Sequence, residues 1–171
     1  MPDNGRLTFL LGGARSGKSA HAERLVSALP APWAYIATGQ AFDDEMRERI
    51  AQHRARRSRG WQTIDAPLDL VAALGALPDG QPALIDCLTL WLSNQMLAER
   101  DVERECAALT EALGRPRGPW FVVSNEVGLG IVPENALARR FRDAQGRLNQ
   151  QVAAAADAVI FMVAGLPMQV K

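Results

Sequence analysis

Short apolar runs alternate with longer helical patterns from one end of the chain to the other. The apolar runs are continuous rather than alternating, which is typical of strands that are buried on both faces of a sheet. We expect strong strands at 7–11, 33–37, 83–86, 120–124 and 158–163, and a weaker strand at 62–64.

Helical periodicity fills the segments between these strands. The expected helices lie at about 17–29, 43–57, 68–77, 90–113 and 135–156, and an interruption in the fourth is left open. Repeated strand–helix–strand order predicts a mostly parallel α/β sheet with right-handed crossovers and helices on both faces. Asp43 and Asp44 suit the positive N-terminal end of the second helix. No linker or internal repeat is visible, so we expect one domain over residues 1–171.

Composition agrees with a globular protein. Of the 171 residues, 48% are apolar and 22% are charged, and the formal net charge is zero. A neutral chain has no global field that favours nucleic acid, so we expect no nucleic-acid partner. No apolar stretch approaches the roughly 20 residues that span a bilayer, and the polar N-terminus does not resemble a signal peptide. Cys87 and Cys106 form neither a disulfide framework nor a zinc site, which indicates a cytoplasmic protein.

The strongest chemical signal follows the first strand. The run Gly12-Gly13-Ala14-Arg15-Ser16-Gly17-Lys18-Ser19 matches the nucleotide-binding pattern G-x-x-x-x-G-K-[ST] at every fixed position. Glycines let the backbone N–H groups converge on phosphate oxygens, and the following helix adds its positive end. We expect Lys18 to reach the β and γ phosphates as a catalytic residue, and Ser19 to coordinate Mg²⁺. The strand before the loop and the helix after it complete the motif, so we predict a P-loop domain of the RecA-like class.

Asp86 ends the third strong strand. A carboxylate there suits a Walker B position, which orients Mg²⁺ and its water shell beside a nucleotide. The alternative is an ordinary aspartate that caps the next helix. No Asn-Lys-x-Asp motif is present, which argues against a switch GTPase.

His53 lies on the expected helix 43–57 and shares a face with Met46 and Ile50 at the spacing i, i+4, i+7. A neutral imidazole could attack an α-phosphate whose charge nearby guanidinium groups neutralise. The other reading, which spacing alone favours, is a histidine that completes an amphipathic face beside a solvated basic stretch. His21, on the helix after the phosphate loop, is expected to be structural. The arginines close to His53 are Arg49, Arg54, Arg56, Arg57 and Arg59.

A third candidate segment follows the strand at 120–124 and contains Asn125, Glu126 and Gly128. It lies at the carboxyl edge of the sheet, where open α/β folds place ligands. The segment is either a substrate-binding loop or a flexible connection to the next helix, and its sequence favours neither.

Together these segments resemble the bifunctional adenosylcobinamide kinase/adenosylcobinamide-phosphate guanylyltransferase family of cobalamin synthesis, from about residue 7 to residue 171. His53 and the run 86–89 contribute to the resemblance, whereas many kinases share the phosphate loop. The most specific matches are Asn125-Glu126-Val127-Gly128-Leu129-Gly130-Ile131-Val132-Pro133 and Ile36-Ala37-Thr38 followed by Asp43-Asp44-Glu45-Met46.

The resemblance implies two reactions. ATP or GTP phosphorylates adenosylcobinamide, and GMP from GTP is then transferred to that phosphate, giving adenosylcobinamide-GDP and pyrophosphate. His53 matches the histidine that carries GMP in this family, which reverses the reading from spacing. The resemblance also implies Mg²⁺, a corrinoid substrate and a homotrimer. It also implies that Ala37, Thr38, Arg54 and Asp86 bind the nucleotide. Some members of the family carry Glu at the position of Asp86.

Two other functions remain open. A simple P-loop small-molecule kinase would transfer the γ-phosphate and take no label from the α-phosphate. A RecA-like ATPase module would hydrolyse nucleotide in response to a protein or nucleic-acid partner.

Overall fold

One seven-stranded sheet runs through the molecule. The structure is a computed structural model that describes residues 5–41, 43–56 and 59–171, without the side chains of Arg49, His53, Arg54 and Arg56. The strand order is β3-β2-β4-β5-β1-β6-β7, and all neighbours are parallel except the antiparallel pair β6 and β7. The strands are β1 (Arg6–Gly12), β2 (Trp33–Ala37), β3 (Trp61–Asp65), β4 (Ala83–Asp86), β5 (Pro119–Asn125), β6 (Ala158–Val163) and β7 (Leu166–Gln169).

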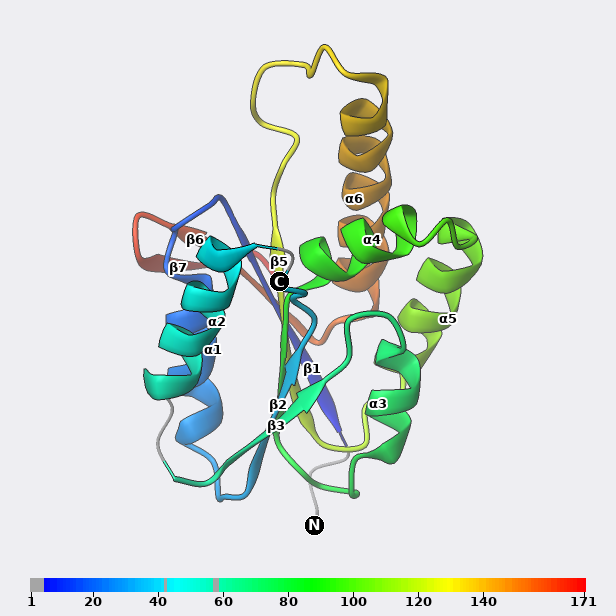
Figure 1. The fold of residues 1–171 in the computed structure, drawn as a ribbon. Coiled ribbons are helices and arrows are strands. Elements are labelled where there is room, and N and C mark those ends of the chain that lie inside the picture. The colour runs from blue at the N-terminus through cyan, green and yellow to red at the C-terminus, as the bar shows by residue number, and fades with distance from the viewer. Residues whose placement is uncertain (1–4, 42, 57–58) are drawn as a thin grey trace.

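Helices cover both faces of this sheet (Figure 1). On one side lie α1 (Lys18–Ser27) and α2 (Asp44–Arg56). On the other side lie α3 (Leu70–Ala76), α4 (Leu88–Leu97), α5 (Val102–Leu113) and α6 (Ala136–Ala155). The predicted fold class, a mostly parallel sheet with helices on both faces, is therefore confirmed.

Each central strand supplies side chains to two separate cores, because successive residues of a strand point to opposite faces. On β1, Phe9 packs into the larger core with residues of α3 to α6. Its neighbour Leu10 packs into the smaller core with Ala22 and Val26 of α1. This burial on both faces explains why the central strands read as continuous apolar runs.

The predicted helical region 90–113 is divided into α4 and α5. Glu99 adopts the left-handed backbone conformation, with φ of 54°, and the Arg100 N–H donates back to the Gln95 carbonyl at 3.1 Å. Asp101 then caps α5, since its side chain accepts a hydrogen bond from the Arg104 N–H at 3.2 Å. The interruption that the sequence left open is a true helix end followed by a new N-cap.

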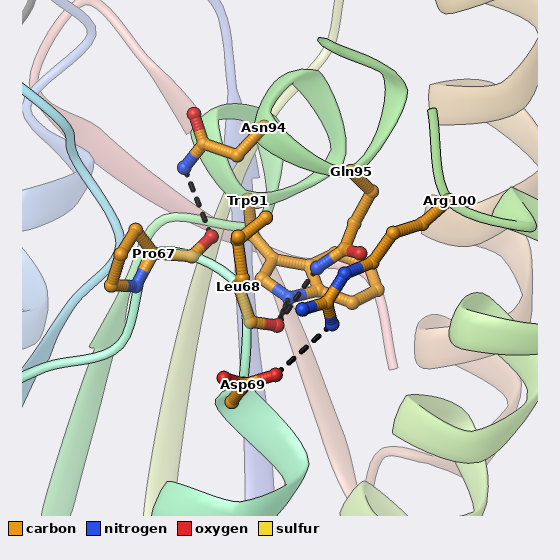
Figure 2. Close-up of polar contacts among 7 residues, drawn as sticks. All are labelled: Pro67, Leu68, Asp69, Trp91, Asn94, Gln95 and Arg100. Atoms are coloured by element: carbon orange, nitrogen blue, oxygen red, sulfur yellow. Dashed lines mark hydrogen bonds and ion pairs between the residues drawn. The ribbon is translucent and has the colours of Figure 1, made fainter. Parts of the chain in front are cut away.

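Side chains of α4 hold the connection between β3 and α3 (Figure 2). The Trp91 indole and the Gln95 amide both donate to the Leu68 carbonyl, at 3.0 and 2.8 Å. Asn94 donates to the Pro67 carbonyl at 3.0 Å. Trp91, Asn94 and Gln95 are buried, and their bonds satisfy carbonyls of the partly buried residues Pro67 and Leu68. None of the described helices is both long and apolar enough to cross a bilayer.

Candidate active site

A cleft of about 1030 Å³ opens at the carboxyl ends of the parallel strands. Residues 14–20, from the phosphate loop and the first turn of α1, form one wall, and α2 contributes Met46, Arg47 and Ile50 to another. Residues at or beside strand ends complete the cleft, because the carboxyl ends of β2, β3, β4 and β5 meet at this edge. Among them are Ala37, Asp65, Asp86, Cys87 and Asn125.

The phosphate loop connects β1 directly to α1. Gly17, with φ of 92°, occupies the N-cap of α1 in a conformation that favours glycine. Gly12 ends β1 in a crowded position, where an added Cβ would lie 2.8 Å from both the Met162 carbonyl oxygen and the Ser16 Oγ. The first glycine of the motif therefore permits close packing against β6, and Gly17 permits the turn into the helix.

Lys18 is buried within the loop, with 7% of its surface exposed. Its Nζ donates to the Gly13 carbonyl and lies 3.4 Å from the Ser16 Oγ. Burial lowers the pKa of Lys18, while nearby Cys87 and Asp86 act in the opposite direction. The ammonium group is thus held inside the curl of the loop, at the floor of the cleft.

Asp86, at the end of β4, lines the same cleft. Its Oδ2 accepts a hydrogen bond from the Tyr35 hydroxyl at 2.9 Å. The alternative in which Asp86 caps the next helix is wrong, because the N-cap of α4 is Cys87. The Asp86 carboxylate is oriented by a tyrosine of the neighbouring strand instead.

Thr38 follows β2 but does not line the cleft. Its side chain is fully buried, and its Oγ1 both donates to the Cys87 carbonyl at 2.6 Å and accepts from the Cys87 N–H at 2.8 Å. Asn94 donates to the Thr38 carbonyl at 2.7 Å. Thr38 therefore joins the ends of β2 and β4 beneath the cleft, whereas Ala37 lines it.

Asn125 lines the cleft from the end of β5 and is held by two other elements. Its N–H donates to Thr89 Oγ1 at 2.8 Å, and its carbonyl accepts from Asn149 Nδ2 at 3.1 Å. Asn149 is itself buried in a network with Ser124 and Gln145, in which Ser124 Oγ donates to Asn149 Oδ1 at 2.7 Å. These contacts explain the polar residues on the buried side of α6.

The loop after β5 extends away from the sheet before it reaches α6 (Figure 1). Glu126 begins it by donating its N–H to the Gly12 carbonyl at 3.0 Å, and its carboxylate accepts from the Gly128 N–H at 2.7 Å. Of the three predicted loop residues, only Asn125 lines the cleft. Further along, Leu129 and Ile131 are 83% and 98% exposed, so the loop presents apolar side chains to solvent.

His53 and Arg54 lie on α2, but their side chains fall outside the part of the molecule that the structure describes. The helix itself is described, and the Asp43 carboxylate caps it by accepting from the Met46 N–H at 2.7 Å. His21 is bonded within its own helix, since Arg24 Nη2 lies 2.9 Å from its Nδ1. Burial and the Arg24 charge both lower the pKa of His21, with burial the larger cause.

Two charged residues of the cleft escaped sequence reasoning. Asp65 ends β3 and lines the cleft, and Ala37 of β2 pairs with both Asp65 and Asp86 on the flanking strands. The rule that ligands bind at carboxyl strand ends would have found it, had the strand at 62–64 been extended by one residue. Arg47 lines the cleft from α2 and is paired with Asp44.

The donor set fits Mg²⁺ held between protein and nucleotide. Ser19 and Asp86 line the cleft and supply the oxygen atoms that Mg²⁺ prefers. Over the described residues there is no group of three or more His, Cys, Asp or Glu that could hold a metal by itself. Mg²⁺ in nucleotide sites is usually bound by one or two protein oxygens together with phosphates, which matches this arrangement.

A phosphate loop after the inner strand β1, a buried lysine inside it and a carboxylate at the end of β4 define a P-loop nucleotide-binding enzyme. Residues 8–170 match the model of the family described as cobinamide kinase / cobinamide phosphate guanyltransferase, CobU. The chain belongs to this family.

Named relatives cover nearly the whole chain. The bifunctional adenosylcobalamin biosynthesis protein CobP of Pseudomonas aeruginosa is 50% identical over 168 residues, which is 95% of this chain and 96% of the relative. The bifunctional adenosylcobalamin biosynthesis protein CobU of Salmonella typhimurium is 40% identical over 182 aligned positions, 96% of this chain and 99% of the relative. The family named from sequence motifs is therefore confirmed.

A solved structure supports the fold. A protein from Pyrococcus horikoshii OT3 superposes with a TM-score of 0.58 at 9% identity, over 97% of this chain and 86% of the other. At such low identity the likeness concerns the fold alone.

Proposed function

We propose that this protein phosphorylates adenosylcobinamide with ATP or GTP and then transfers GMP from GTP to the new phosphate. One observation carries the proposal: a single cleft is walled by the phosphate loop with its buried Lys18 and by α2, the helix that bears His53. We further propose a cytoplasmic homotrimer, as the family resemblance implies. Sedimentation of the purified protein would test the trimer.

In the kinase step the substrate hydroxyl oxygen attacks the γ-phosphorus, and the nucleoside diphosphate leaves. Backbone N–H groups of residues 13–19 and the Lys18 ammonium bind the triphosphate and stabilise charge on the transferred group. Mg²⁺ held by Ser19 and Asp86 would neutralise phosphate charge, and Tyr35 keeps the Asp86 carboxylate oriented.

In the guanylyltransferase step a ring nitrogen of His53 attacks the α-phosphorus of GTP. The P–N bond forms as the P–O bond to pyrophosphate breaks, and the phosphate of the corrinoid then displaces the histidine to give the diphosphate product. Helical spacing supports this role, because Met46 and Ile50 line the cleft and position 53 continues their face. We assign Arg54 to binding of the transferred phosphate.

We propose that the loop after β5 contacts the corrinoid. Asn125 faces the cleft at its start, and the exposed apolar side chains that follow suit a large, partly apolar substrate. The candidate residues are Asn125, Glu126 and Gly128.

The test is incubation with Mg²⁺ and GTP labelled in the α-phosphate, followed by mass spectrometry of the protein. We expect one GMP on His53, stable to base and labile to acid. His53→Ala should abolish the label and retain γ-phosphate transfer to adenosylcobinamide, since that step uses the loop rather than the histidine. His21→Ala is the matched control and should be labelled like the parent.

Wild-type protein that takes no label under these conditions would exclude the histidine intermediate. Phosphorylation of adenosylcobinamide without labelling would favour the simple kinase. Nucleotide hydrolysis that responds to a partner, without corrinoid turnover, would favour the ATPase module.

A further inference from the structure

The hairpin formed by β6 and β7 touches the phosphate loop with its turn. Val163 pairs with Leu166, so Ala164 and Gly165 form a two-residue turn. Their φ angles are 51° and 81°, and positive φ at both positions is the type I′ geometry that matches the twist of a hairpin. The Gly165 N–H is the point of contact, since it donates to the Ser16 carbonyl of the phosphate loop at 3.0 Å.

The hairpin and the phosphate loop approach each other closely at two glycines of the loop, Gly12 and Gly17. A Cβ added to Gly17 would lie 3.3 Å from the Gly165 Cα, and one added to Gly12 would lie 2.8 Å from the Met162 carbonyl oxygen. Strand β6 and its turn therefore pack against the phosphate loop at Gly12, Ser16 and Gly17.

The far end of the hairpin is fixed as well. The Val159 N–H donates to the Lys171 carbonyl at 3.1 Å. Lys171 Nζ also donates to the Ala153 and Ala154 carbonyls, at 3.2 and 3.1 Å, at the C-terminal end of α6. The turn is therefore attached to a rigid element and can hold the phosphate loop in place.

Peptide geometry shows what this hydrogen bond does. In a trans peptide the carbonyl and the N–H point in opposite directions. When Gly165 holds the Ser16 carbonyl on the hairpin side, the N–H of the same peptide, which belongs to Gly17, points to the opposite side. Ser16 and Gly17 both line the cleft, so that opposite side is where a phosphate would lie.

We propose that Gly165 is a positioning residue of the phosphate loop: its N–H fixes the Ser16–Gly17 peptide so that the Gly17 N–H is aimed at a bound phosphate. The inference rests on the proposed role of this loop as the triphosphate site, and it adds a residue that lies outside the motif. Gly165 contacts no substrate itself.

The sharpest test replaces the Gly165 amide by an ester, with glycolic acid incorporated at position 165 in the full chain. The ester removes one N–H and changes neither the side chain nor the turn. We expect affinity for Mg²⁺-GTP and for inorganic pyrophosphate to fall about three- to ten-fold, the usual effect of one hydrogen bond. The KM for the triphosphate should rise by the same factor while kcat changes little.

A pair of ordinary variants makes the same comparison. Gly165→Asn keeps the N–H, tolerates the left-handed conformation, and has room, since nothing lies within 4 Å of an added Cβ. Gly165→Pro lacks the N–H and cannot adopt positive φ. We expect triphosphate affinity near that of the parent for Gly165→Asn and a loss of at least ten-fold for Gly165→Pro.

The ratio of Mg²⁺-GTP affinity to GMP affinity separates positioning from folding. A merely structural role would lower the Tm and leave this ratio unchanged, and an ester variant with an unchanged ratio would overturn the inference. Lys18→Ala is measured in parallel. If Lys18→Ala also keeps full triphosphate affinity, the phosphate site itself is wrongly assigned; if only the Gly165 ester keeps it, the positioning role alone fails.

Discussion

At the scale of single residues, Thr38 illustrates a polar side chain used twice. Its hydroxyl serves both the N–H and the carbonyl of Cys87, and no part of the Thr38 side chain reaches solvent. Buried backbone groups left without partners cost about 1–3 kcal/mol each. The hydroxyl therefore stabilises the junction of β4 and α4, directly below the cleft.

Replacing Thr38 by valine should lower the free energy of unfolding by about 1–3 kcal/mol, since the buried Cys87 N–H loses its acceptor. The Cys87 carbonyl still accepts from the Trp91 N–H at 3.2 Å. Urea unfolding followed by circular dichroism would measure the change. Thr38→Ser keeps the hydroxyl and should retain most of the stability. Equal losses in the two variants would show that the hydroxyl bonds contribute little.

The two cysteines give a second prediction at this scale. Burial raises the pKa of the Cys87 thiol to about 12 and that of Cys106 to about 11. Both thiols should therefore resist iodoacetamide at pH 8 in the folded protein and react quickly in guanidinium chloride, as mass spectrometry would show. Rapid alkylation of folded protein at pH 8 would contradict the burial of these thiols.

The same shifts set an alkaline limit on stability. The pKa of a thiol in the unfolded chain is about 9. Above that pH the thiols of the unfolded protein lose protons that the thiols of the folded protein keep. The contribution of the two protonated thiols to the free energy of unfolding is therefore complete below pH 9. It is lost as the pH rises toward the folded-state pKa values of about 11 and 12. Unfolding free energies measured between pH 8 and 11 should fall, and less steeply in Cys87→Ala.

At the scale of secondary structure elements, α4 carries most of the polar contacts that hold the connection after β3 (Figure 2). Asn94 donates to the buried Thr38 carbonyl and to the partly buried Pro67 carbonyl. The ion pair between Arg100 and Asp69 lies nearby but is exposed, with 36% and 72% of the two side chains accessible. The buried Asn94 amide should therefore contribute much more to the free energy of unfolding than the exposed ion pair between Arg100 and Asp69.

We expect Asn94→Ala to lower the free energy of unfolding by about 1–3 kcal/mol, because the buried Thr38 carbonyl and the partly buried Pro67 carbonyl lose a donor. Arg100→Ala, the matched surface change, should cost less than about 1 kcal/mol. Thermal unfolding of the two variants under identical conditions would compare them. A larger loss for Arg100→Ala would reverse this interpretation.

The elements that the sequence predicted well are those with a strong apolar pattern. The five strong strands lie within one residue of their predicted bounds, and the outer ends of the predicted helices lie within two residues. The predicted helix 90–113 is two helices, α4 and α5. By contrast, β7 was not predicted, because its residues Leu166–Gln169 are all exposed and include a proline. The turn before it, Ala164-Gly165, also lacks the Asn-Gly or Asp-Gly pair that usually marks a hairpin.

At the scale of the whole molecule, strand order brings the site together. The phosphate loop was predicted from its local pattern, and Asp86 and Asn125 were candidates from theirs. Parallel strands place the three at one edge of the sheet. Contacts between distant residues could not be read in this way. The hydrogen bond between Tyr35 and Asp86 depends on the register of β2 and β4. The hydrogen bond between Gly165 and Ser16 depends on the turn between β6 and β7, which has no recognisable sequence motif.

The position of β1 has a consequence for the order of events during folding. It is an inner strand whose partners come late in the chain, since Leu10 pairs with Val123 on one side and Ile160 on the other. Contacts of such long sequence separation form slowly. The nucleotide-binding motif is therefore synthesised before the strands that flank it, and a nascent chain displays the motif well before β5 and β6 complete a site that can bind a triphosphate.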